Sequence, residues 1–295
     1  MNNLNGILLV IASMAAFTIE DIFIKRLSTE VATGQILVVI GVFCGLTFFA
    51  MMLWSRNSLF RVEAWSVASV ARIISEAFAA FCFVTALSRV DISTVAAVFQ
   101  ATPLAITMGA ALFMGEKVGW RRWSAIFVGL AGVIIIIRPG ASGFDQQVLW
   151  VVAAVLLIAV RDLTTRRISS KVASTVISCQ AYAGLMIAGV LMLLFMPGQE
   201  ISAIAPHHIW AYAAAVVFGV AGYYGIVSAM RVADASAVTP FRYMRLPFSI
   251  LAGMLVFQER PDLITYLGAA LIILSGLYTF LRERRLAHEE IAAAG

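Results

Sequence analysis

Ten apolar runs, each about as long as a membrane-spanning helix, occupy most of this chain. They cover residues 4–25, 31–54, 65–88, 92–114, 120–137, 147–165, 172–196, 207–230, 235–257 and 263–281. A helix needs about 20 mainly apolar residues to cross the hydrocarbon core of a bilayer. Only 13% of the 295 residues are charged, about half the share found in soluble domains. We therefore predict an all-α membrane protein with ten transmembrane helices.

The basic residues indicate the orientation of these helices. An even number of spans places both termini on one side of the membrane, and cytoplasmic loops carry an excess of Lys and Arg. With cytoplasmic termini, the cytoplasmic segments hold twelve basic residues: Arg56, Arg61, Lys117, Arg121, Arg122, Arg166, Arg167, Lys171, Arg231, Arg282, Arg284 and Arg285. The other loops hold five: Lys25, Arg26, Arg89, Arg138 and Arg260. We predict that both termini are cytoplasmic.

The chain also repeats itself. Residues 19–28 align with residues 160–169 at an offset of 141. At an offset of 143, Ala86, Asp91, Ser93, Val95 and Glu116 recur as Ala229, Asp234, Ser236, Val238 and Glu259. Each half holds five predicted helices, an odd number, so the second half would enter the membrane upside down. We predict two inverted repeats, 1–140 and 141–283, followed by a cytoplasmic tail over 284–295.

Inverted repeats are typical of secondary transporters, because exchange of the two halves' conformations alternates access to a central site. The inversion is also compatible with an evolutionary relic of no mechanistic use. Composition and repeats together favour transport.

The ends of the two halves resemble a known family. Gly115-Glu116 and Gln258-Glu259 each close the fourth helix of a repeat, before a Gly-rich final helix. In the first half Trp120-Arg121-Arg122-Trp123 and Gly129-Leu130-Ala131-Gly132-Val133 follow. Over its whole length the chain is similar to the drug/metabolite transporter superfamily, in the branch whose repeat is the EamA domain.

One stretch is similar to a narrower group within that branch. Asp234-Ala235-Ser236-Ala237-Val238-Thr239-Pro240-Phe241-Arg242-Tyr243 resembles members that include bacterial S-adenosylmethionine carriers, although these have an acidic residue where this chain has Arg245. The resemblance implies alternating access and a central cavity lined mainly by the first, third, fourth, sixth, eighth and ninth helices. It also implies a multi-pass protein of a cell membrane, with a bacterial inner membrane expected.

Two arginines near the middle of the ninth predicted helix are the main candidates for substrate binding. Ionisable groups in a membrane span are unfavourable unless they face protein or water. Arg242 and Arg245 are spaced i and i+3 and so share a helix face. Guanidinium groups suit planar carboxylate or phosphate groups. We predict that they clamp an anionic group of the substrate; in the alternative, Glu76 neutralises one of them and the set only holds the bundle together.

Arg72 and Glu76 are spaced i and i+4 on the third predicted helix and can pair with each other. Glu76 is also a candidate for proton coupling or for binding a substrate amine. Together with Arg242 and Arg245 these groups would carry a charge of +2, which favours an anionic or zwitterionic substrate over a cation.

Further charges lie toward the ends of the first and sixth predicted helices. Glu20, Asp21, Arg161 and Asp162 are candidates for gating or coupling. By repeat symmetry Asp21 and Asp162 would lie at opposite mouths of the cavity. The i,i+4 pairs that they form with Lys25 and Arg166 are interpreted first as ion pairs at helix ends.

Prolines and aromatic residues complete the candidate set. Pro240 and Pro247 flank the two arginines and would weaken the ninth helix as hinges, because each lacks a backbone donor. Candidate cavity walls are Tyr223, Tyr224, Tyr243, Phe99 and Gln100, although Tyr side chains more often pack between helices. Gly219, Gly222 and Gly225 favour close helix packing.

The predicted function is secondary-active transport of a small organic anion or zwitterion, such as a carboxylate, amino acid or nucleotide-like metabolite. The alternative substrate is a cationic or neutral metabolite, such as S-adenosylmethionine or a vitamin, and the alternative class is a channel or scaffold. We expect no enzyme activity, cofactor or metal, because no catalytic, phosphate-binding or metal-binding motif occurs. The expected partners are the substrate, lipid and, for coupling, protons, without nucleic acid. The sequence leaves a monomer and a homodimer both open.

Overall fold

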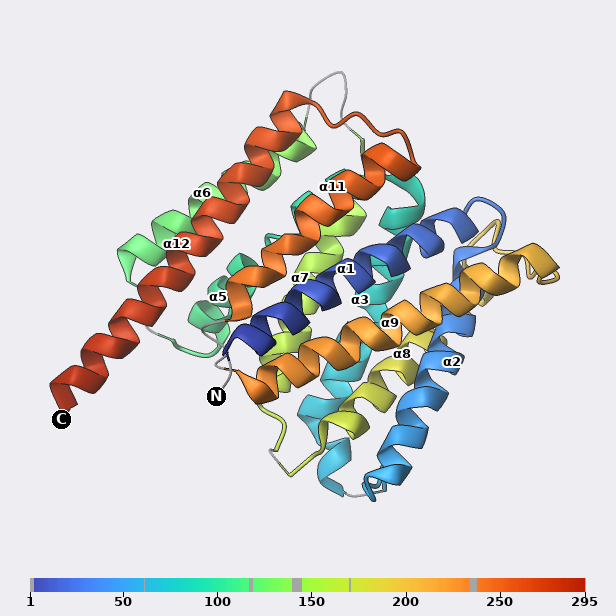
Figure 1. Cartoon of the computed structure of the whole chain (residues 1–295), viewed down its shortest axis with the longest axis horizontal. Coiled ribbons are helices and arrows are strands. Elements are labelled where there is room, and N and C mark those ends of the chain that lie inside the picture. The colour runs from blue at the N-terminus through green and yellow to red at the C-terminus, as the bar shows by residue number, and fades with distance from the viewer. Residues whose placement is uncertain are drawn as a thin grey trace.

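The computed structural model describes residues 3–60, 62–116, 119–139, 145–169, 171–233 and 238–294 (Figure 1). Residues 234–237, which belong to the stretch that carries the narrower resemblance, lie outside this set. Within it, nine helical segments are long and apolar enough to cross a membrane. They are α1 (Asn3–Leu27), α2 (Thr33–Trp54), α3 (Val67–Arg89), α4 with α5 (Ile92–Phe99 and Thr102–Phe113), α6 (Trp120–Ile137), α7 (Val148–Thr165), α8 (Ser174–Phe195), α9 (Pro206–Val232) and α12 (Leu263–Ala294). A short 3-10 helix, η1 (Val62–Trp65), precedes α3.

The tenth segment is broken, which corrects the continuous helix predicted over 235–257. Among the residues that the structure describes there, a 3-10 helix, η2 (Thr239–Met244), is followed by α11 (Arg245–Val256). Pro240 opens η2, and Pro247 lies in the first turn of α11, where its missing N–H removes no helical hydrogen bond. The predicted helix 92–114 is likewise divided, between α4 and α5.

The two breaks occupy equivalent positions in the repeats. The helix α5 spans 102–113 and α11 spans 245–256, so both of their boundaries differ by 143 residues. This is the offset found in the sequence between these parts of the two halves. In both halves, the described part of the fourth segment therefore has a break just before α5 or α11.

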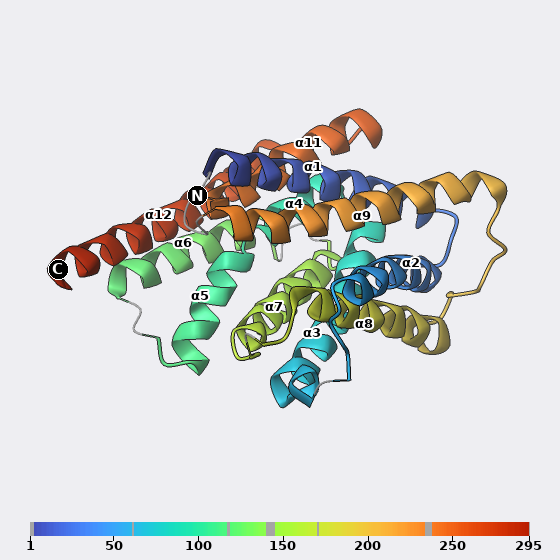
Figure 2. The same ribbon diagram turned by 60° about the horizontal axis from the view of Figure 1, so that its bottom comes forward.

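The packing of the helices also repeats between the halves. The most extensive contacts are α1 with α9, α3 with α7, α2 with α8, and α6 with α12. Exchanging each helix for its counterpart (α1 for α7, α2 for α8, α3 for α9, α6 for α12) returns the same four pairs. In both views the pair α6 and α12 lies on the opposite side of the bundle from α2 and α8 (Figures 1 and 2).

Glycines allow the closest of these crossings. A Cβ on Gly34 of α2 would lie 2.8 Å from the carbonyl oxygen of Gly189 on α8, and a Cβ on Gly189 would lie 2.6 Å from that of Gly34. Gly132 of α6 and Gly268 of α12 have the same reciprocal relation, at 2.7 Å each way. Small residues let membrane helices approach until their backbones touch.

The helices α1 and α9 lie against each other along most of their length, as the spacing of the α9 glycines predicts. A Cβ on Gly219 would lie 2.5 Å from Glu20 Oε1, and a Cβ on Gly222 would lie 2.9 Å from the ring of Phe17. Because these positions are glycines, the α9 backbone can pack directly against Glu20 and Phe17 of α1.

The outer surface carries the apolar side chains expected of a protein in lipid. Large exposed examples include Leu8, Phe43, Phe78, Phe127, Leu194 and Leu255. Cys44, Cys82 and Cys179 are buried and free of disulfides. The last helix, α12, continues to Ala294, so the residues predicted as a separate tail extend this helix.

Candidate functional site

A central cavity of about 330 Å³ lies where the two halves meet. This volume is within the range of sites for small-molecule ligands. Its walls come from α1, α3, α7, α9 and both interrupted segments, as the family resemblance implies, and also from α2 and α8. Seven charged side chains line it: Glu20, Asp21, Glu76, Arg161, Asp162, Arg242 and Arg245.

Arg245, at the start of α11, is held by a carboxylate and three aromatic rings. Its Nη2 atom donates to Asp21 Oδ2 at 2.7 Å. The guanidinium carbon lies 5.4 Å, 5.5 Å and 5.1 Å from the ring centres of Phe17, Phe83 and Phe99, within the range of cation–π attraction. Asp21 therefore pairs with Arg245, which corrects its predicted pairing with Lys25.

A second charged group links α3 to α7. Glu76 accepts from Arg161 Nη1 at 3.0 Å and lies 3.3 Å from Arg72 Nη2, so the predicted Arg72–Glu76 pair is present. Arg161 also contacts Asp162 Oδ1 at 2.8 Å. Asp162 thus pairs with its neighbour Arg161, whereas the prediction paired it with Arg166. Two arginines and two carboxylates balance each other in this network.

Glu20 and Arg242 differ from the other charges of the cavity. Neither side chain makes a hydrogen bond or ion pair with any residue that the structure describes. Glu20 lies on α1 over Gly219 of α9, and Arg242 lies in η2 with its side chain exposed to the cavity. The cavity therefore presents one carboxylate and one guanidinium that remain available to a ligand.

The charge of the site corrects the predicted excess of +2. Four carboxyl groups and three guanidinium groups line the cavity, and Arg72 lies directly behind Glu76, so positive and negative groups are equal in number. The prediction failed because it placed Glu20, Asp21 and Asp162 at helix ends, away from the centre. The structure brings all three to the same cavity.

The other predicted site residues are divided between the cavity and its surroundings. Tyr223, Phe99 and Gln100 line the cavity. Tyr224 is 55% exposed on the outside of the bundle and does not line it. Tyr243 is buried behind the wall, with its hydroxyl against Gly276 and its carbonyl accepting a 3.2 Å hydrogen bond from Gln100 Nε2. Pro240 and Pro247 lie in the break, outside the lining.

Sequence reasoning missed several aromatic walls. Tyr182 of α8 lines the cavity and lies 6.0 Å from the ring of Tyr223, and both rings pack on Phe48. Phe17 and Phe83 flank Arg245. No sequence signal separates these residues from the many other aromatic side chains of the apolar runs.

Two ion pairs, equivalent between the repeats, lie at opposite ends of α3. Beside the last residue of α3, Lys25 pairs with Glu259 at 3.5 Å and also donates to the carbonyl of Val90. Near the first turns of α3, Arg166 pairs with Glu116 at 3.1 Å. This pair lies beside α3 because Arg72 Nε of α3 donates to Thr165, the residue directly before Arg166. In the repeat alignment Lys25 corresponds to Arg166 and Glu259 to Glu116.

The two ends differ in exposure. The exposed fractions of the side chains are 4% for Glu259 against 42% for Glu116, 15% for Lys25 against 50% for Arg166, and 6% for Asp21 against 30% for Asp162. Glu259 also accepts hydrogen bonds from the backbone of Ile92 and Ser93 and from the hydroxyl of Ser93, at 2.7, 3.1 and 2.6 Å. The end that contains Lys25 and Glu259 is therefore closed, and the end that contains Arg166 and Glu116 is more open.

Comparisons with known proteins agree with a transport site. The chain is 24% identical to an S-adenosylmethionine uptake transporter of Rickettsia prowazekii over 96% of this chain and 94% of that protein. It is 34% identical to a riboflavin transporter of Vibrio cholerae over 66% of this chain and 64% of that protein, and 30% identical to one of Rhizobium johnstonii over 73% and 70%. A solved crystal structure matches with a TM-score of 0.61 at 21% identity, over 93% of this chain and 98% of that chain, which shows a shared fold.

The family model of the EamA-like transporters matches residues 4–138 and 146–281, nearly the whole chain. This match confirms the resemblance found in the sequence, and it supports a transporter rather than an enzyme. The chain belongs to the EamA-like transporter family, within the drug/metabolite transporter superfamily, and is a multi-pass membrane transporter of small metabolites.

Proposed function

We propose that this transporter is a secondary carrier of a small metabolite that has both a positive and a negative group and a flat ring. The observation that carries the proposal is the cavity itself, in which an unpaired Glu20 and an unpaired Arg242 face a space walled by aromatic rings. Glu20 would bind the positive group and Arg242 the carboxylate. Tyr182, Tyr223 and the phenylalanines around Arg245 would contact the ring.

The balanced charge of the cavity changes the preferred substrate class. A simple organic anion would leave Glu20 unpaired and close to a like charge, which is unfavourable in a site of low polarity. The relatives named for S-adenosylmethionine and riboflavin also favour a cationic, zwitterionic or neutral substrate. S-Adenosylmethionine, which has an amino acid group, a sulfonium and an adenine ring, is the first compound to test, and riboflavin is the second.

Alternating access is the proposed mechanism, and the unequal ends of the cavity support it. In this conformation the Lys25–Glu259 pair closes one end, while the equivalent Arg166–Glu116 pair is exposed at the other. In a carrier built from inverted repeats, the halves exchange conformations, so the second pair would become buried as the first opens. The distribution of Lys and Arg supports a non-cytoplasmic location for the closed end.

Coupling to protons, if it occurs, would involve Glu20 rather than Glu76. Glu76 is fixed between two guanidinium groups, and its protonation would leave both without a charged partner. Glu20 has no such partner among the described residues and lies in the cavity wall, so it can exchange a proton when the substrate leaves. Glu20→Gln should therefore flatten the pH dependence of uptake, whereas loss of Glu76 should impair folding.

Ligand-induced thermal stabilisation of the purified protein tests the binding site. We expect Arg242→Ala to abolish stabilisation by S-adenosylmethionine and to leave stabilisation by its decarboxylated analogue intact, because the analogue lacks the carboxylate. Glu20→Gln should weaken both ligands. Tyr224→Phe, on the outer face of the same bundle, is the matched control and should bind like the wild type. Wild-type binding by both cavity variants would exclude this site.

Uptake into proteoliposomes tests the transport class. A carrier shows saturable uptake that is stimulated when unlabelled substrate is loaded inside, whereas a channel shows no such counter-flow. Uptake of riboflavin without S-adenosylmethionine would identify the ring, rather than the two charges, as the recognised feature. Absence of uptake for every compound that stabilises the protein would favour a scaffold or receptor.

A further inference from the structure

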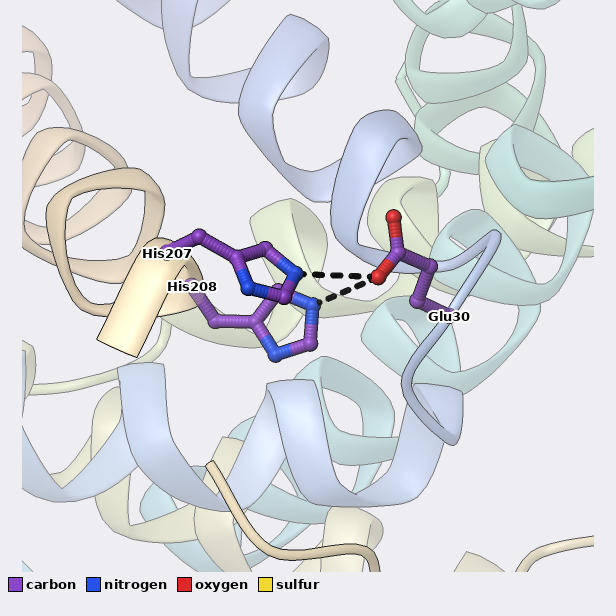
Figure 3. Close-up of side chains that lie close together, drawn as sticks. All are labelled: Glu30, His207 and His208. Carbon is purple, nitrogen blue, oxygen red and sulfur yellow. Dashed lines mark hydrogen bonds and ion pairs between the residues drawn. The ribbon is translucent and has the colours of Figure 1, made fainter. Parts of the chain in front are cut away.

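Three side chains of types that bind metals lie close together (Figure 3), and none of them lines the cavity. Glu30 lies in the turn between α1 and α2, and His207 and His208 lie in the first turn of α9. The Nε2 atoms of His207 and His208 are 3.1 Å and 3.0 Å from the same oxygen, Oε2 of Glu30. All three donor atoms lie within 4.8 Å of one another, and in Figure 3 both rings point toward that carboxylate.

We propose that Glu30, His207 and His208 bind a divalent transition-metal ion of the Zn²⁺ type. Two imidazoles and one carboxylate are a common protein ligand set for Zn²⁺, with metal–ligand distances of about 2.0 to 2.2 Å. Ligand atoms at such distances in a tetrahedral site are about 3.3 Å apart. The observed spacings fall short of this by only a few tenths of an ångström, so small side-chain rotations admit the ion.

The backbone that presents the three ligands is fixed by hydrogen bonds and packing. The amide of Glu30 donates to the carbonyl of Leu27 at 3.1 Å, and the amide of His208 donates to that of Ala205 at 2.9 Å. The glycine-lined contact between α1 and α9 holds the two sides of the site together. A preformed arrangement of this kind reduces the ordering that metal binding would otherwise require.

The exposure of this cluster also suits a metal ion. His208 is only 9% exposed, whereas His207 and Glu30 are mostly exposed, so an ion can enter from solvent and keep a water as fourth ligand.

The ligand atoms determine which ions this site can bind. Imidazole ligands suit Zn²⁺, Cu²⁺ and Ni²⁺, whereas Mg²⁺ and Ca²⁺ prefer oxygen ligands. Metal ligands must be deprotonated, so protons compete with the ion and binding should weaken in acid.

Titration of Zn²⁺ into the purified, tag-free full-length protein tests the proposal by calorimetry and by metal analysis after gel filtration. We expect one Zn²⁺ per chain at pH 7.5, weaker binding at pH 5.5, and no competition from a large excess of Mg²⁺. Glu30→Gln, His207→Ala and His208→Ala should each weaken binding at least about tenfold, as is typical when a metal loses a supporting group. His288→Ala, which removes the remaining histidine of the chain, is the matched control and should bind like the wild type.

Gel-filtration elution and thermal melting of the variants distinguish loss of a specific site from misfolding. His207 and Glu30 are exposed, so their variants should elute and melt like the wild type in the presence of a chelator. Wild-type protein that binds no Zn²⁺, or variants that retain wild-type affinity, would overturn the proposal. The site does not depend on the transported substrate, since its test involves neither the cavity nor uptake.

Discussion

Glu259→Gln provides the sharpest test of the closed end, because Glu116→Gln is its equivalent at the open end. The carboxylate of Glu259 joins Lys25 at the end of α1 to the amides of Ile92 and Ser93 at the start of α4. The substitution removes the charge and one of the two acceptor oxygens while keeping the shape. Glu116 pairs with Arg166 in an exposed position, and the same change there removes an ion pair that is largely in water.

The expected magnitudes follow from burial. Breaking one side of a buried ion pair costs about 3 to 5 kcal/mol, and a hydrogen bond to a charged group contributes about 1.5 to 3 kcal/mol. Both effects act through one carboxylate and do not add, and Lys25 keeps its contacts with the Val90 carbonyl and the ring of Phe257. We expect Glu259→Gln to destabilise the closed end by about 3 kcal/mol, and Glu116→Gln to cost about 0 to 1 kcal/mol.

Hydrogen exchange of the peptide that contains Ile92 and Ser93 measures this difference directly. A loss of about 3 kcal/mol corresponds to roughly 10²-fold faster exchange of these amides if they exchange by local opening. Glu116→Gln should leave their exchange within about fivefold of the wild type. Ser93→Ala, which removes only the hydroxyl contact, should give an intermediate effect.

Equal exchange in the Glu259→Gln and Glu116→Gln proteins would refute the reasoning. It would mean that the closed end is held by packing alone and that the two pairs, although equivalent in sequence, do not report the state of the cavity. Slower uptake in both variants, with unchanged hydrogen exchange of the Ile92 and Ser93 amides, would also refute it.

Two further predictions concern stability. Gly34→Ala should lower the free energy of unfolding by about 1 to 3 kcal/mol, because its Cβ would meet the backbone of Gly189 at 2.8 Å; Gly45→Ala, whose Cβ has only an ordinary 3.6 Å contact, should be neutral or stabilising in the same thermal unfolding assay. Asp262 accepts hydrogen bonds from Arg138 and Thr265, which lower its pKa to about 2, so its stabilising effect should be present above about pH 4 and lost as the pH falls toward 2. The unfolding free energies of wild type and Asp262→Asn should therefore differ at pH 6 and converge near pH 2, and a constant difference would contradict this.

The helices were predictable from the sequence because lipid leaves few alternatives. A run of about 20 apolar residues with no water to satisfy its backbone must be helical, and the predicted limits of α1, α2 and α3 agree with the structure within about two residues. The gap between the predicted runs 65–88 and 92–114 also agrees with the break between α3 and α4, where charged residues would be unfavourable in lipid. The breaks were harder to foresee, since Pro103, Pro240 and Pro247 are compatible with both bent and interrupted helices.

The charged residues of the site were predictable from the sequence, but most of their ion-pair partners were not. Every charged residue that lines the cavity was identified as a candidate, because any ionisable group in an apolar run stands out. Which charges meet depends on how α1 lies against α11 and α3 against α7, and local spacing carries no information about that. The i,i+4 rule correctly gave Arg72 with Glu76, but it assigned Asp21 to Lys25, and the actual partners are 224 positions apart.

A contact between Gln100 and Tyr243 joins the two fourth segments at their breaks. These residues are 143 positions apart, the offset of the repeats, so each is the counterpart of the other. Gln100 Nε2 donates to the carbonyl of Tyr243, which lies where η2 meets α11, and backbone polar groups at membrane depth need partners.

A contact between two counterparts lies on the axis that relates the halves. In the proposed alternating-access mechanism, a residue on such an axis would move least, whereas pairs far from it, such as Lys25–Glu259 and Arg166–Glu116, would break or form. The cavity is lined by Gln100 and Arg242 at the breaks. In the proposed mechanism, these two side chains would therefore stay in place while access to the cavity changes around them.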